Sequence, residues 1–426
     1  MSPEVRQALI ARLAVARVTK GKAKAVLARV SADGRLRGML AYWGAHTGRW
    51  AGRGFQPQNL TRPIPSIDYE EVHRALSRIL AGELVGGDRV AEATQYLQLV
   101  CGEHGCSMGA LLSSLLRGVI ISATGQLASV DYSAIEARVL LWLAGDEEGL
   151  EVYRRFDAEG GPDPYMHAAS AIYGVEPGEI DKAQRAVGKV VVLACGYGGS
   201  VAAFDAMAGA YGVDTSALEV RGIVDAWRDS RPLVAGERTG GGFFTEPEDD
   251  EEPEWIITRR GGLWKALTKV VWEVVAGDAL GTHEAGRCTW SMAGGHLICT
   301  LPSGRPLVYR EAKIEERDTQ YGRREVITFA GRLSGRSGWH RVATYGGRLA
   351  ENVTQAAARD LLADAIVRLE GVPGVQVVLT VHDEILAEVH DEEGLRAIER
   401  VMLDPPAWAA GLPVAVDGHV RERYGK

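Results

Sequence analysis

The stretch LASVDYSAIEARVL, residues 127–140, joins a strand-like segment to a helix-like one. Residues 127–130 are apolar or β-prone, and apolar residues at positions 135, 139 and 140 then recur on one side of a helical pattern. The pattern predicts that Asp131 lies where a strand ends and a helix begins. A carboxylate with rigid backbone on both sides suits a metal site, although one aspartate cannot hold a catalytic metal alone.

A second acidic site lies in VVLTVHDEILAEV, residues 377–389. Two β-branched or apolar runs flank His382, Asp383 and Glu384, which predicts a hairpin with these three residues at its bend. If the hairpin pairs beside the strand that ends at Asp131, then Asp131 and Asp383 can bridge two hard cations about 3.5–4 Å apart, an arrangement used for in-line phosphoryl transfer. The spacing alone does not establish that the two aspartates meet.

The composition is that of an ordinary globular protein with two or three subdomains. The chain has 426 residues, of which 46% are hydrophobic and 24% charged. It contains no run of about 18 apolar residues, and residues 1–20 mix charged with apolar side chains. Neither a membrane span nor a signal peptide is predicted, so a cytoplasmic location is expected.

The five cysteines are odd in number and dispersed, which argues against a disulfide framework. Cys101, His104 and Cys106 lie close together, but no second pair of Cys or His residues supplies the remaining ligands of a zinc site. An ordinary loop is the better interpretation of this segment.

The net charge of −8 at first argues against a nucleic-acid partner. Residues 246–254 read EPEDDEEPE, however, and their seven acidic side chains account for the difference between −8 and −1. This run is predicted to be a solvated, disordered loop. The overall charge is therefore uninformative about the substrate.

The rest of the chain is mostly helical before residue 290 and richer in strands after it. Residues 42–60 combine glycines, aromatic residues, arginines and amides in an irregular loop. Its Arg49, Arg53, Gln58 and Asn59 could contact phosphates or minor-groove acceptors, although a glycine-rich surface loop explains them equally well. The predicted helices are 3–19, 69–80, 90–99, 108–116, much of 151–193, 263–285 and 351–369, with a loose segment at 236–262 and a β-rich block at 290–344.

The most specific helical signal is QRAVGKVVVLACGYG, residues 184–198. Arg185, Lys189, Leu193 and Tyr197 are spaced by four, so they descend one helix face. Two cations, an apolar residue and an aromatic ring in this order suit a nucleoside triphosphate lying along the helix, with its phosphates at the cationic end.

The three stretches, in this order, resemble motifs A, B and C of the family A (Pol I-like) DNA polymerases, most closely the bacteriophage-type members and their polymerase domain. DYSAIEARVLLWLAGD resembles motif A, RAVGKVVVLACGYG motif B and VHDEI motif C. HTGRW and QPQNL resemble the TGR and QN primer–template motifs of the family. The resemblance covers roughly residues 22–426, with inserts at 66–116 and 236–262.

The resemblance implies a role for each matched residue. Asp131 and Asp383, with the Tyr132 carbonyl, would bind two Mg²⁺ ions, for which Mn²⁺ could substitute, and Glu384 would support this site. The nucleotide-binding residues would be Glu136 as the steric gate against a ribose 2′-OH, His167, Arg185 and Lys189 at the triphosphate, Leu193, and Tyr197 near the templating base. Lys189 would also protonate the departing pyrophosphate. The primer–template contacts would come from Arg49, Gln58, Asn59, Gln355 and His382.

The chain also departs from the family pattern. Leu193 stands where the family commonly has Phe or Tyr, which affects stacking on the nucleotide. Only about 21 residues precede the palm-like segment, and no upstream segment carries the paired carboxylates of a 3′–5′ exonuclease. The expectation is a reduced or missing thumb, no proofreading, and a thumb, exonuclease or processivity partner supplied by another chain.

The resulting prediction is an α+β right-hand polymerase fold with an antiparallel palm sheet and helical fingers. The predicted segments are a short N-terminal helix at 1–21, a first palm part at 22–150 with the helical insert 66–116, fingers at 151–300 with the acidic loop 236–262, and a second palm part at 301–426. The predicted function is synthesis of DNA on primer–template DNA from dNTPs, without a membrane partner, in the host cytoplasm if a phage encodes the chain. The alternatives are a catalytically silent DNA-binding accessory protein, a single-subunit RNA polymerase or reverse transcriptase, and a metal-dependent nuclease.

Overall fold

The computed structural model describes residues 21–22, 24–61, 63–83, 88–123, 125–243, 255–278, 281–319, 322–332 and 337–425. The helix predicted at 3–19 and the acidic run 246–254 lie outside these residues. The chain divides into two compact units. Unit 1 comprises Met1–Tyr132, Leu362–Asp404 and Val416–Lys426, and unit 2 comprises Ser133–Leu361 and Pro405–Ala415.

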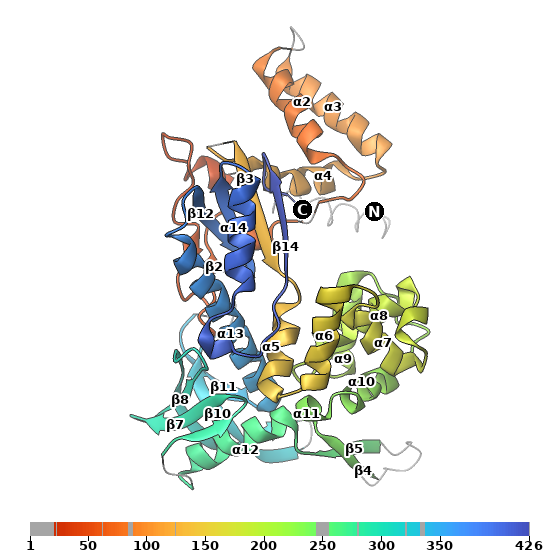
Figure 1. Cartoon of the computed structure of the whole chain (residues 1–426), viewed down its shortest axis with the longest axis vertical. Coiled ribbons are helices and arrows are strands. Elements are labelled where there is room, and N and C mark those ends of the chain that lie inside the picture. The colour runs from red at the N-terminus through yellow and green to blue at the C-terminus, as the bar shows by residue number, and fades with distance from the viewer. Residues whose placement is uncertain are drawn as a thin grey trace, which may run out of the picture. The chain divides into compact units, whose positions relative to one another are not determined.

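Unit 1 is built on a four-stranded antiparallel sheet in the order β12-β13-β3-β14 (Figure 1). Its strands are β12 (Val375–Val381), β13 (Glu384–Val389), β3 (Gln126–Tyr132) and β14 (Val416–Arg421). β3 has a hydrogen-bonded neighbour on each side, and its residues 127–130 are buried. The burial of this central strand on both faces explains why its sequence reads as a continuous apolar run.

Both faces of this sheet are covered. The helix α14 (Glu392–Leu403) packs on one face and buries Ile398 and Met402 there. On the other face, strand residues pack with the segment that carries β1 (Leu40–Ala41), β2 (Ala51–Gly52) and the 3₁₀ turn η1 (Pro57–Asn59). This core consists of Met39, Phe55, Leu60, Leu127, Val381, Leu386 and Tyr424.

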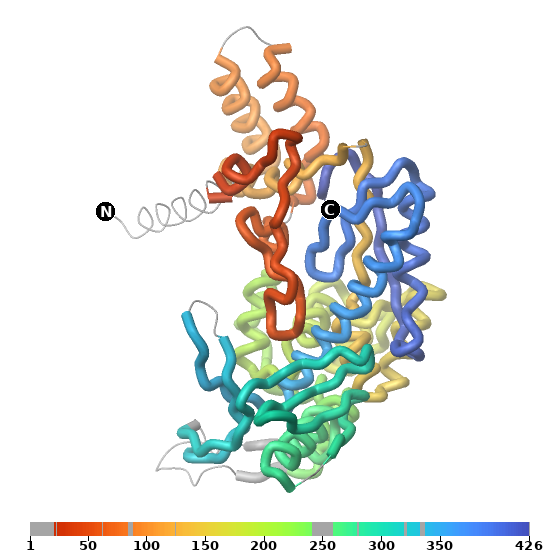
Figure 2. The backbone as a smooth tube through the Cα atoms, turned by 90° about the vertical axis from the view of Figure 1, so that its left-hand side faces the viewer, coloured from red at the N-terminus to blue at the C-terminus, as the bar shows by residue number. Residues whose placement is uncertain are grey.

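The helical insert in unit 1 has a small core of its own. Its helices are α2 (Tyr69–Ala81), α3 (Arg89–Glu103) and α4 (Met108–Leu115), followed by the 3₁₀ turn η2 (Arg117–Val119). The side chains of Asp68, Asp88 and Ser107 cap the three helices. Helices α2 and α3 lie side by side (Figure 2), and the shared core is formed by Ile67, Val72, Leu97, Val100, Leu111 and Leu115. The three helices predicted here are confirmed.

The first part of unit 2 is helical. Its helices are α5 (Ile135–Ala144), α6 (Glu147–Glu159), α7 (Pro164–Tyr173), α8 (Lys182–Cys195), α9 (Val201–Tyr211), α10 (Val220–Asp229), α11 (Pro232–Ala235) and α12 (Gly262–Ala276), with the 3₁₀ turns η3 (Pro177–Glu179) and η4 (Ala407–Ala409). The strands β4 (Glu237–Phe243) and β5 (Trp255–Arg260) pair with each other between α11 and α12. The prediction of a loose segment at 236–262 is therefore wrong at its two described ends, which are paired strands.

The second part of unit 2 is a six-stranded antiparallel sheet in the order β11-β10-β9-β8-β7-β6. Its strands are β6 (His283–Ala285), β7 (Cys288–Ala293), β8 (His296–Thr300), β9 (Pro306–Thr319), β10 (Gly322–Gly331) and β11 (His340–Thr344). Helix α13 (Gly346–Leu369) follows, and the boundary between the units falls within it. The predicted helix at 263–285 is too long, because Gly277 ends α12 with a left-handed φ of 84° and residues 283–285 form a strand.

Candidate active site

Strand pairing brings the two predicted metal-binding segments together. In the register of β13 and β3, Glu384 lies opposite Asp131. The hairpin turn between β12 and β13 consists of His382 and Asp383, and the Tyr132 backbone N–H donates to the Asp383 carbonyl oxygen at 3.3 Å. The predicted hairpin is confirmed, with the difference that Glu384 already belongs to β13 and only two residues form the turn.

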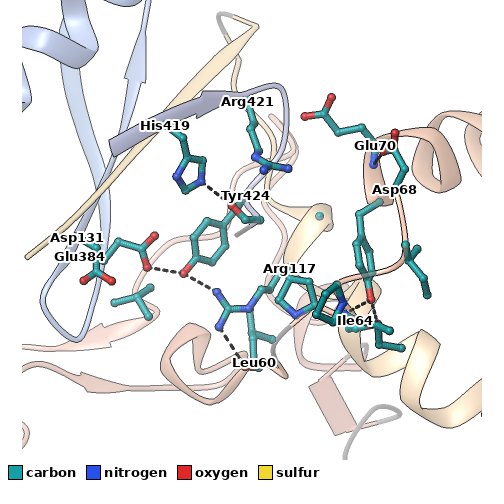
Figure 3. Close-up of a pocket in the computed structure, with 18 of the residues that line it drawn as sticks. Leu60, Ile64, Asp68, Glu70, Arg117, Asp131, Glu384, His419, Arg421 and Tyr424 are labelled. Atoms are coloured by element: carbon teal, nitrogen blue, oxygen red, sulfur yellow. Dashed lines mark hydrogen bonds between the residues drawn. The ribbon is translucent and has the colours of Figure 1, made fainter. Parts of the chain in front are cut away.

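Asp131 and Asp383 both line one cavity of about 1230 Å³ in unit 1. Both aspartates are half-buried, whereas His382 is exposed and has a left-handed φ of 58°. The remaining walls come from β14, the C-terminal segment and the chain around residues 58–70 and 114–118 (Figure 3). The structure thus places two carboxylates on the wall of a wide cavity.

Glu384 is held inside the protein rather than presented to the cavity as an open ligand. It is 2% exposed. One carboxylate oxygen accepts a hydrogen bond from the Ser129 hydroxyl, and the other accepts one from the Tyr424 hydroxyl at 2.8 Å. Arg117 in turn donates to the Tyr424 oxygen at 3.0 Å (Figure 3). Both oxygens of Glu384 are therefore engaged by the protein itself.

Arg117 anchors this chain of hydrogen bonds to the backbone. Its guanidinium donates to the carbonyl oxygens of Thr61 at 3.1 Å and Leu60 at 3.3 Å, and it lies 5.1 Å from the centre of the Tyr424 ring. Burial, and then the neighbouring Glu384 carboxylate, raise the pKa of Tyr424 well above its usual range. Tyr424 is thus a stable proton donor to Glu384.

The donor set fits an open site for hard cations. In the described ranges, no group of three or more His, Cys, Asp and Glu side chains is arranged to hold a metal ion. Mg²⁺ in nucleotide-handling sites is bound by one or two carboxylates, with water and substrate phosphates as the other ligands. Asp131 and Asp383 match that smaller set. Burial raises the pKa of the Tyr132 phenol above its usual range, and this side chain belongs to the core, which leaves the Tyr132 backbone carbonyl for the predicted role.

The predicted triphosphate residues lie in unit 2 on α8 and the turn after it. Asp181 caps α8 in a capping box with Gln184. Four residues later, Arg185 donates its Nε to Asp163, which is the N-cap of α7, at 2.6 Å. The guanidinium of Arg185 lies 5.6 Å and the ammonium of Lys189 5.8 Å from the centre of the Tyr165 ring, so both cations face α7.

Gly188 allows α7 and α8 to approach closely. A Cβ atom at this position would lie only 2.1 Å from the Tyr165 carbonyl oxygen. The ammonium of Lys189 is also 5.0 Å from the centre of the Tyr211 ring. Two aromatic rings thus flank Lys189 and restrict where its charge can lie.

His167 lies on α7, one turn beyond Asp163. Burial, and then the positive charge of Arg231, lower the pKa of His167 from its usual value, against the opposing effect of Asp163. His167 is therefore mostly neutral at pH 7, when it can donate one ring hydrogen bond and accept another.

Glu136 and Tyr197 are in direct contact. The Tyr197 hydroxyl donates to a Glu136 carboxylate oxygen at 3.1 Å. Together with Leu193 they line a cavity of about 60 Å³ whose other walls are mostly apolar. The structure therefore brings the predicted gate, the predicted base-stacking ring and Leu193 to one place.

Of the predicted DNA-binding residues, Arg49, Gln58, Asn59 and His382 lie in unit 1 and Gln355 lies on α13 in unit 2. His382 Nε2 is 3.1 Å from the Gln58 carbonyl oxygen, and Gln58 Nε2 donates to the Thr380 carbonyl oxygen at 3.4 Å. The 42–60 loop is thereby tied to the hairpin turn. The side chain of Asn59 donates to Gln56, and that of Gln355 donates to Glu351. Arg49 is half-buried, and its carbonyl oxygen accepts a hydrogen bond from the Ala45 N–H.

Sequence reasoning missed several residues that organise the site. They are Ser129, Arg117 and Tyr424 around Glu384, and Asp163 and Tyr165 beside the α8 cations. Asp163 carried a local signal, because an Asp-Pro pair before a helical pattern marks an N-cap. Arg117 and Tyr424 carried none, since they are 307 positions apart.

The chain is similar in sequence to known DNA polymerases. The chain is 33% identical to the DNA polymerase of Bacillus phage SP02 over 434 aligned residues, which cover 99% of the chain and 57% of the phage protein. It is 37% identical to DNA polymerase I of Chloroflexus aurantiacus over 84 residues, or 20% of the chain and 8% of that protein. The chain thus spans little more than half the length of the phage relative. No protein-family model matches the chain.

The fold is also similar to a solved structure. It matches the POL domain of Pol1 from M. smegmatis, determined in complex with DNA primer-template and dNTP, with a TM-score of 0.54. The sequences are 16% identical, and the match covers 95% of this chain and 51% of the other. This likeness confirms the predicted α+β polymerase fold. The chain is thus similar in sequence to DNA polymerases of a phage and of bacteria, and its fold is that of a polymerase domain.

Proposed function

We propose that the chain is a DNA polymerase that adds dNTPs to the 3′-OH of a primer on a DNA template. One observation carries the proposal. The pairing of β13 with β3 puts Asp131 and Asp383, which are far apart in the sequence, on the wall of one cavity. Two hard carboxylates with room for phosphates beside them are what nucleotidyl transfer requires. The names of the relatives in both phage and bacteria support the same activity.

In this proposal Asp131 and Asp383 hold two Mg²⁺ ions, with Mn²⁺ as a possible substitute. When bound, the two ions would activate the primer 3′-OH and neutralise charge on the triphosphate. Glu384 stays within its hydrogen bonds to Ser129 and Tyr424 and keeps the adjacent turn residue, Asp383, in place. The role of Glu384 is thus to position a metal ligand.

Arg185 and Lys189 bind the triphosphate of the incoming dNTP. The Arg185 guanidinium donates a hydrogen bond to the Asp163 carboxylate. In the complex with a dNTP, phosphate oxygens would replace this carboxylate as acceptors of charge-assisted hydrogen bonds. Lys189 carries its proton between two aromatic rings and donates it to the departing pyrophosphate. His167 adds a neutral hydrogen-bond donor to the same phosphates.

Glu136 selects the sugar. Its carboxylate is fixed by the Tyr197 hydroxyl, so a ribose 2′-OH would meet a side chain that cannot move aside without breaking a hydrogen bond. Tyr197 itself would lie near the templating base, with Leu193 beside it. The residues proposed to follow the primer and template are Arg49, Gln58, Asn59, Gln355 and His382.

Primer extension tests the proposal. The purified chain, given a labelled primer, a defined template, Mg²⁺ and each dNTP in turn, should add only the nucleotide complementary to the template. Asp383→Asn should lose extension by several orders of magnitude while its binding to primer–template DNA changes little. The matched control is Asp404→Asn, the same change in a carboxylate of unit 1 that is 81% exposed. Full activity in Asp383→Asn would remove this residue as a metal ligand.

The absence of proofreading is a separate part of the proposal. A primer with a mismatched 3′ nucleotide should keep its length when incubated with the protein and Mg²⁺ without dNTPs. Shortening of the primer that persists in Asp383→Asn would show an exonuclease and contradict this part alone. A separate thumb or processivity partner would appear as a protein that lengthens the products made in each binding event, and a separate exonuclease partner as a protein that shortens the mismatched primer.

A further inference from the structure

One face of the sheet formed by β9, β10 and β11 in unit 2 is cationic. Residues that lie directly opposite each other in an antiparallel pair share a face, and alternate residues along a strand return to it. Lys313 lies opposite Thr328, Arg317 opposite Arg324, and Ala330 opposite both Arg310 and Arg341. One face therefore collects the basic side chains at 310, 313, 317, 324 and 341.

The other face of the same strands is the packed one. Ala312, Ile327 and Phe329 are buried, with Phe329 packed edge-on against the Tyr309 ring at 5.1 Å between centroids. The basic face carries exposed Arg310, Lys313 and Arg324. It is thus the solvent face of this part of the sheet.

The strand register places the acidic side chain of Glu315 on this face, and a second exposed acid, Glu311, lies at the bulge between Arg310 and Lys313. Hydrogen bonds from Lys313 and Arg317, together with the nearby Arg341, lower the pKa of Glu315 to about 2. The low pKa shows that the neighbouring cations stabilise the ionised carboxylate, so the electrostatic potential around it is positive. The five basic side chains of the face outnumber Glu315 and Glu311, so a surplus of positive charge remains.

An exposed indole lies at one end of the basic face. Trp339 is 54% exposed. The guanidinium carbons of Arg310 and Arg332 lie 5.2 Å and 5.4 Å from the centre of its ring. The β-bulge between Thr328 and Ala330 shifts the register and brings Arg310 into this row.

We propose that this face, together with Arg332 and Trp339 at its end, binds single-stranded DNA; we call it the Trp339 surface (Arg310, Lys313, Arg317, Arg324, Arg332, Arg341 and Trp339). Cations in a row neutralise successive phosphates, and an exposed indole beside guanidinium groups offers flat surfaces on which unpaired bases stack. The proposal rests on the proposed function only for the choice of DNA as the nucleic acid.

The test uses the full chain and a fluorescently labelled oligothymidylate, with affinity followed by anisotropy over a range of salt concentrations and without nucleotides. Trp339→Ala should weaken binding about tenfold, because one stacking contact is lost. Arg332→Gln should reduce the slope of log affinity against log salt by about 0.7, as expected for one phosphate contact to a single strand.

The matched control is Arg323→Gln. Arg323 lies on β10, is exposed and pairs with Glu316 at 2.6 Å, but its position alternates with Arg324, so it belongs to the opposite face. Arg323→Gln makes the same change in net charge as Arg332→Gln. It should leave both the affinity for oligothymidylate and the slope of log affinity against log salt unchanged. All variants replace exposed side chains, and unchanged thermal unfolding would exclude a loss of structure as the cause.

Two results would overturn the proposal. One is unchanged DNA binding in both Trp339→Ala and Arg332→Gln. The other is a loss of affinity in Arg323→Gln as large as that in Arg332→Gln, which would show that net charge alone causes the effect. Primer extension on a template with a very short overhang separates this inference from the proposed function. A protein that binds oligothymidylate through the Trp339 surface but extends no primer would support the inference and contradict the polymerase proposal.

Discussion

Glu384 lies beside the proposed metal site, and in that proposal it supports the site without touching substrate. Its two carboxylate oxygens accept hydrogen bonds from Ser129 and Tyr424, and Arg117 stabilises the Tyr424 oxygen in turn. A buried carboxylate is costly unless its hydrogen bonds are made. The arrangement therefore ties the turn that carries Asp383 to β3, to the segment after β14 and to the end of the helical insert.

Tyr424→Phe tests this role. The change leaves Glu384 and Arg117 without a shared buried partner, so the free energy of unfolding should fall by about 1–3 kcal/mol. Because the turn beside Glu384 also loosens, the Mg²⁺ concentration for half-maximal extension should rise. Urea unfolding measures the first effect and a Mg²⁺ titration of extension the second. The control is Tyr345→Phe, a change in a side chain that is 55% exposed. If Tyr424→Phe lowered stability without changing the Mg²⁺ requirement, the hydrogen bonds around Glu384 would have a structural role only.

Glu136 and Tyr197 give a second prediction at this scale. Glu136→Ala should admit ribonucleotides, because the carboxylate that meets the 2′-OH is removed. Tyr197→Phe keeps the carboxylate but removes the hydrogen bond that fixes it, so the loss of selectivity should be in the same direction and smaller. The ratio of rNTP to dNTP incorporation in primer extension measures both. Sugar selectivity that stays at the level of the wild type in both variants would refute the gate assignment.

At the scale of elements, local patterns predicted what lies within one element and its turn. The junction of β3 with α5 follows from an apolar run that meets a helical period at Asp131, and the β12–β13 hairpin follows from two β-prone runs around a polar break. The contacts of Glu384 could not be predicted in this way, because Arg117 and Tyr424 come from segments with no sequence link to the hairpin. The end of α12 was missed because Gly277 was not recognised as a C-cap.

Helix α2 carries a pH-sensitive contact. His73 Nε2 lies 3.1 Å from the Leu115 carbonyl oxygen, and burial, followed by the charge of Arg423, lowers the pKa of His73 below its usual value. The unfolded chain, with a His pKa of about 6.5, therefore binds a proton more readily than the folded one. The stability gained by keeping this buried imidazole neutral is therefore present above about pH 6.5 and is lost as the pH falls below it, whereas the Leu115 hydrogen bond acts in the opposite direction.

His73→Gln should flatten this dependence. Between about pH 7.5 and about pH 5, the urea midpoint of the wild type should fall more steeply than that of the variant. His46 and His167 also have lowered pKa values through burial, so part of the slope should remain. His390→Gln, a change in an exposed histidine, serves as the control. A slope that is identical in the wild type and in His73→Gln would contradict the prediction.

At the scale of the whole molecule, the chain passes between its two units four times. Unit 1 is assembled from three separate stretches, and one passage lies inside the continuous helix α13. The predicted metal ligands and the predicted triphosphate residues belong to different units, with Tyr132 and Ser133 as adjacent residues at the first passage. Within the part of the chain that the structure describes, no helix is long and apolar enough to cross a membrane.

The order of strands in unit 1 also sets when the site can form during synthesis. β3 leaves the ribosome early, yet both of its neighbours, β13 and β14, lie in the last fifty or so residues, on the order of ten seconds of translation or more behind it. Until then the nascent chain carries Asp131 on a strand without its sheet, which exposes an aggregation-prone edge. A product that stops before Val416 should therefore accumulate as insoluble protein, measured by its share in the pellet after lysis, whereas soluble and folded protein of that length would show that β14 is dispensable.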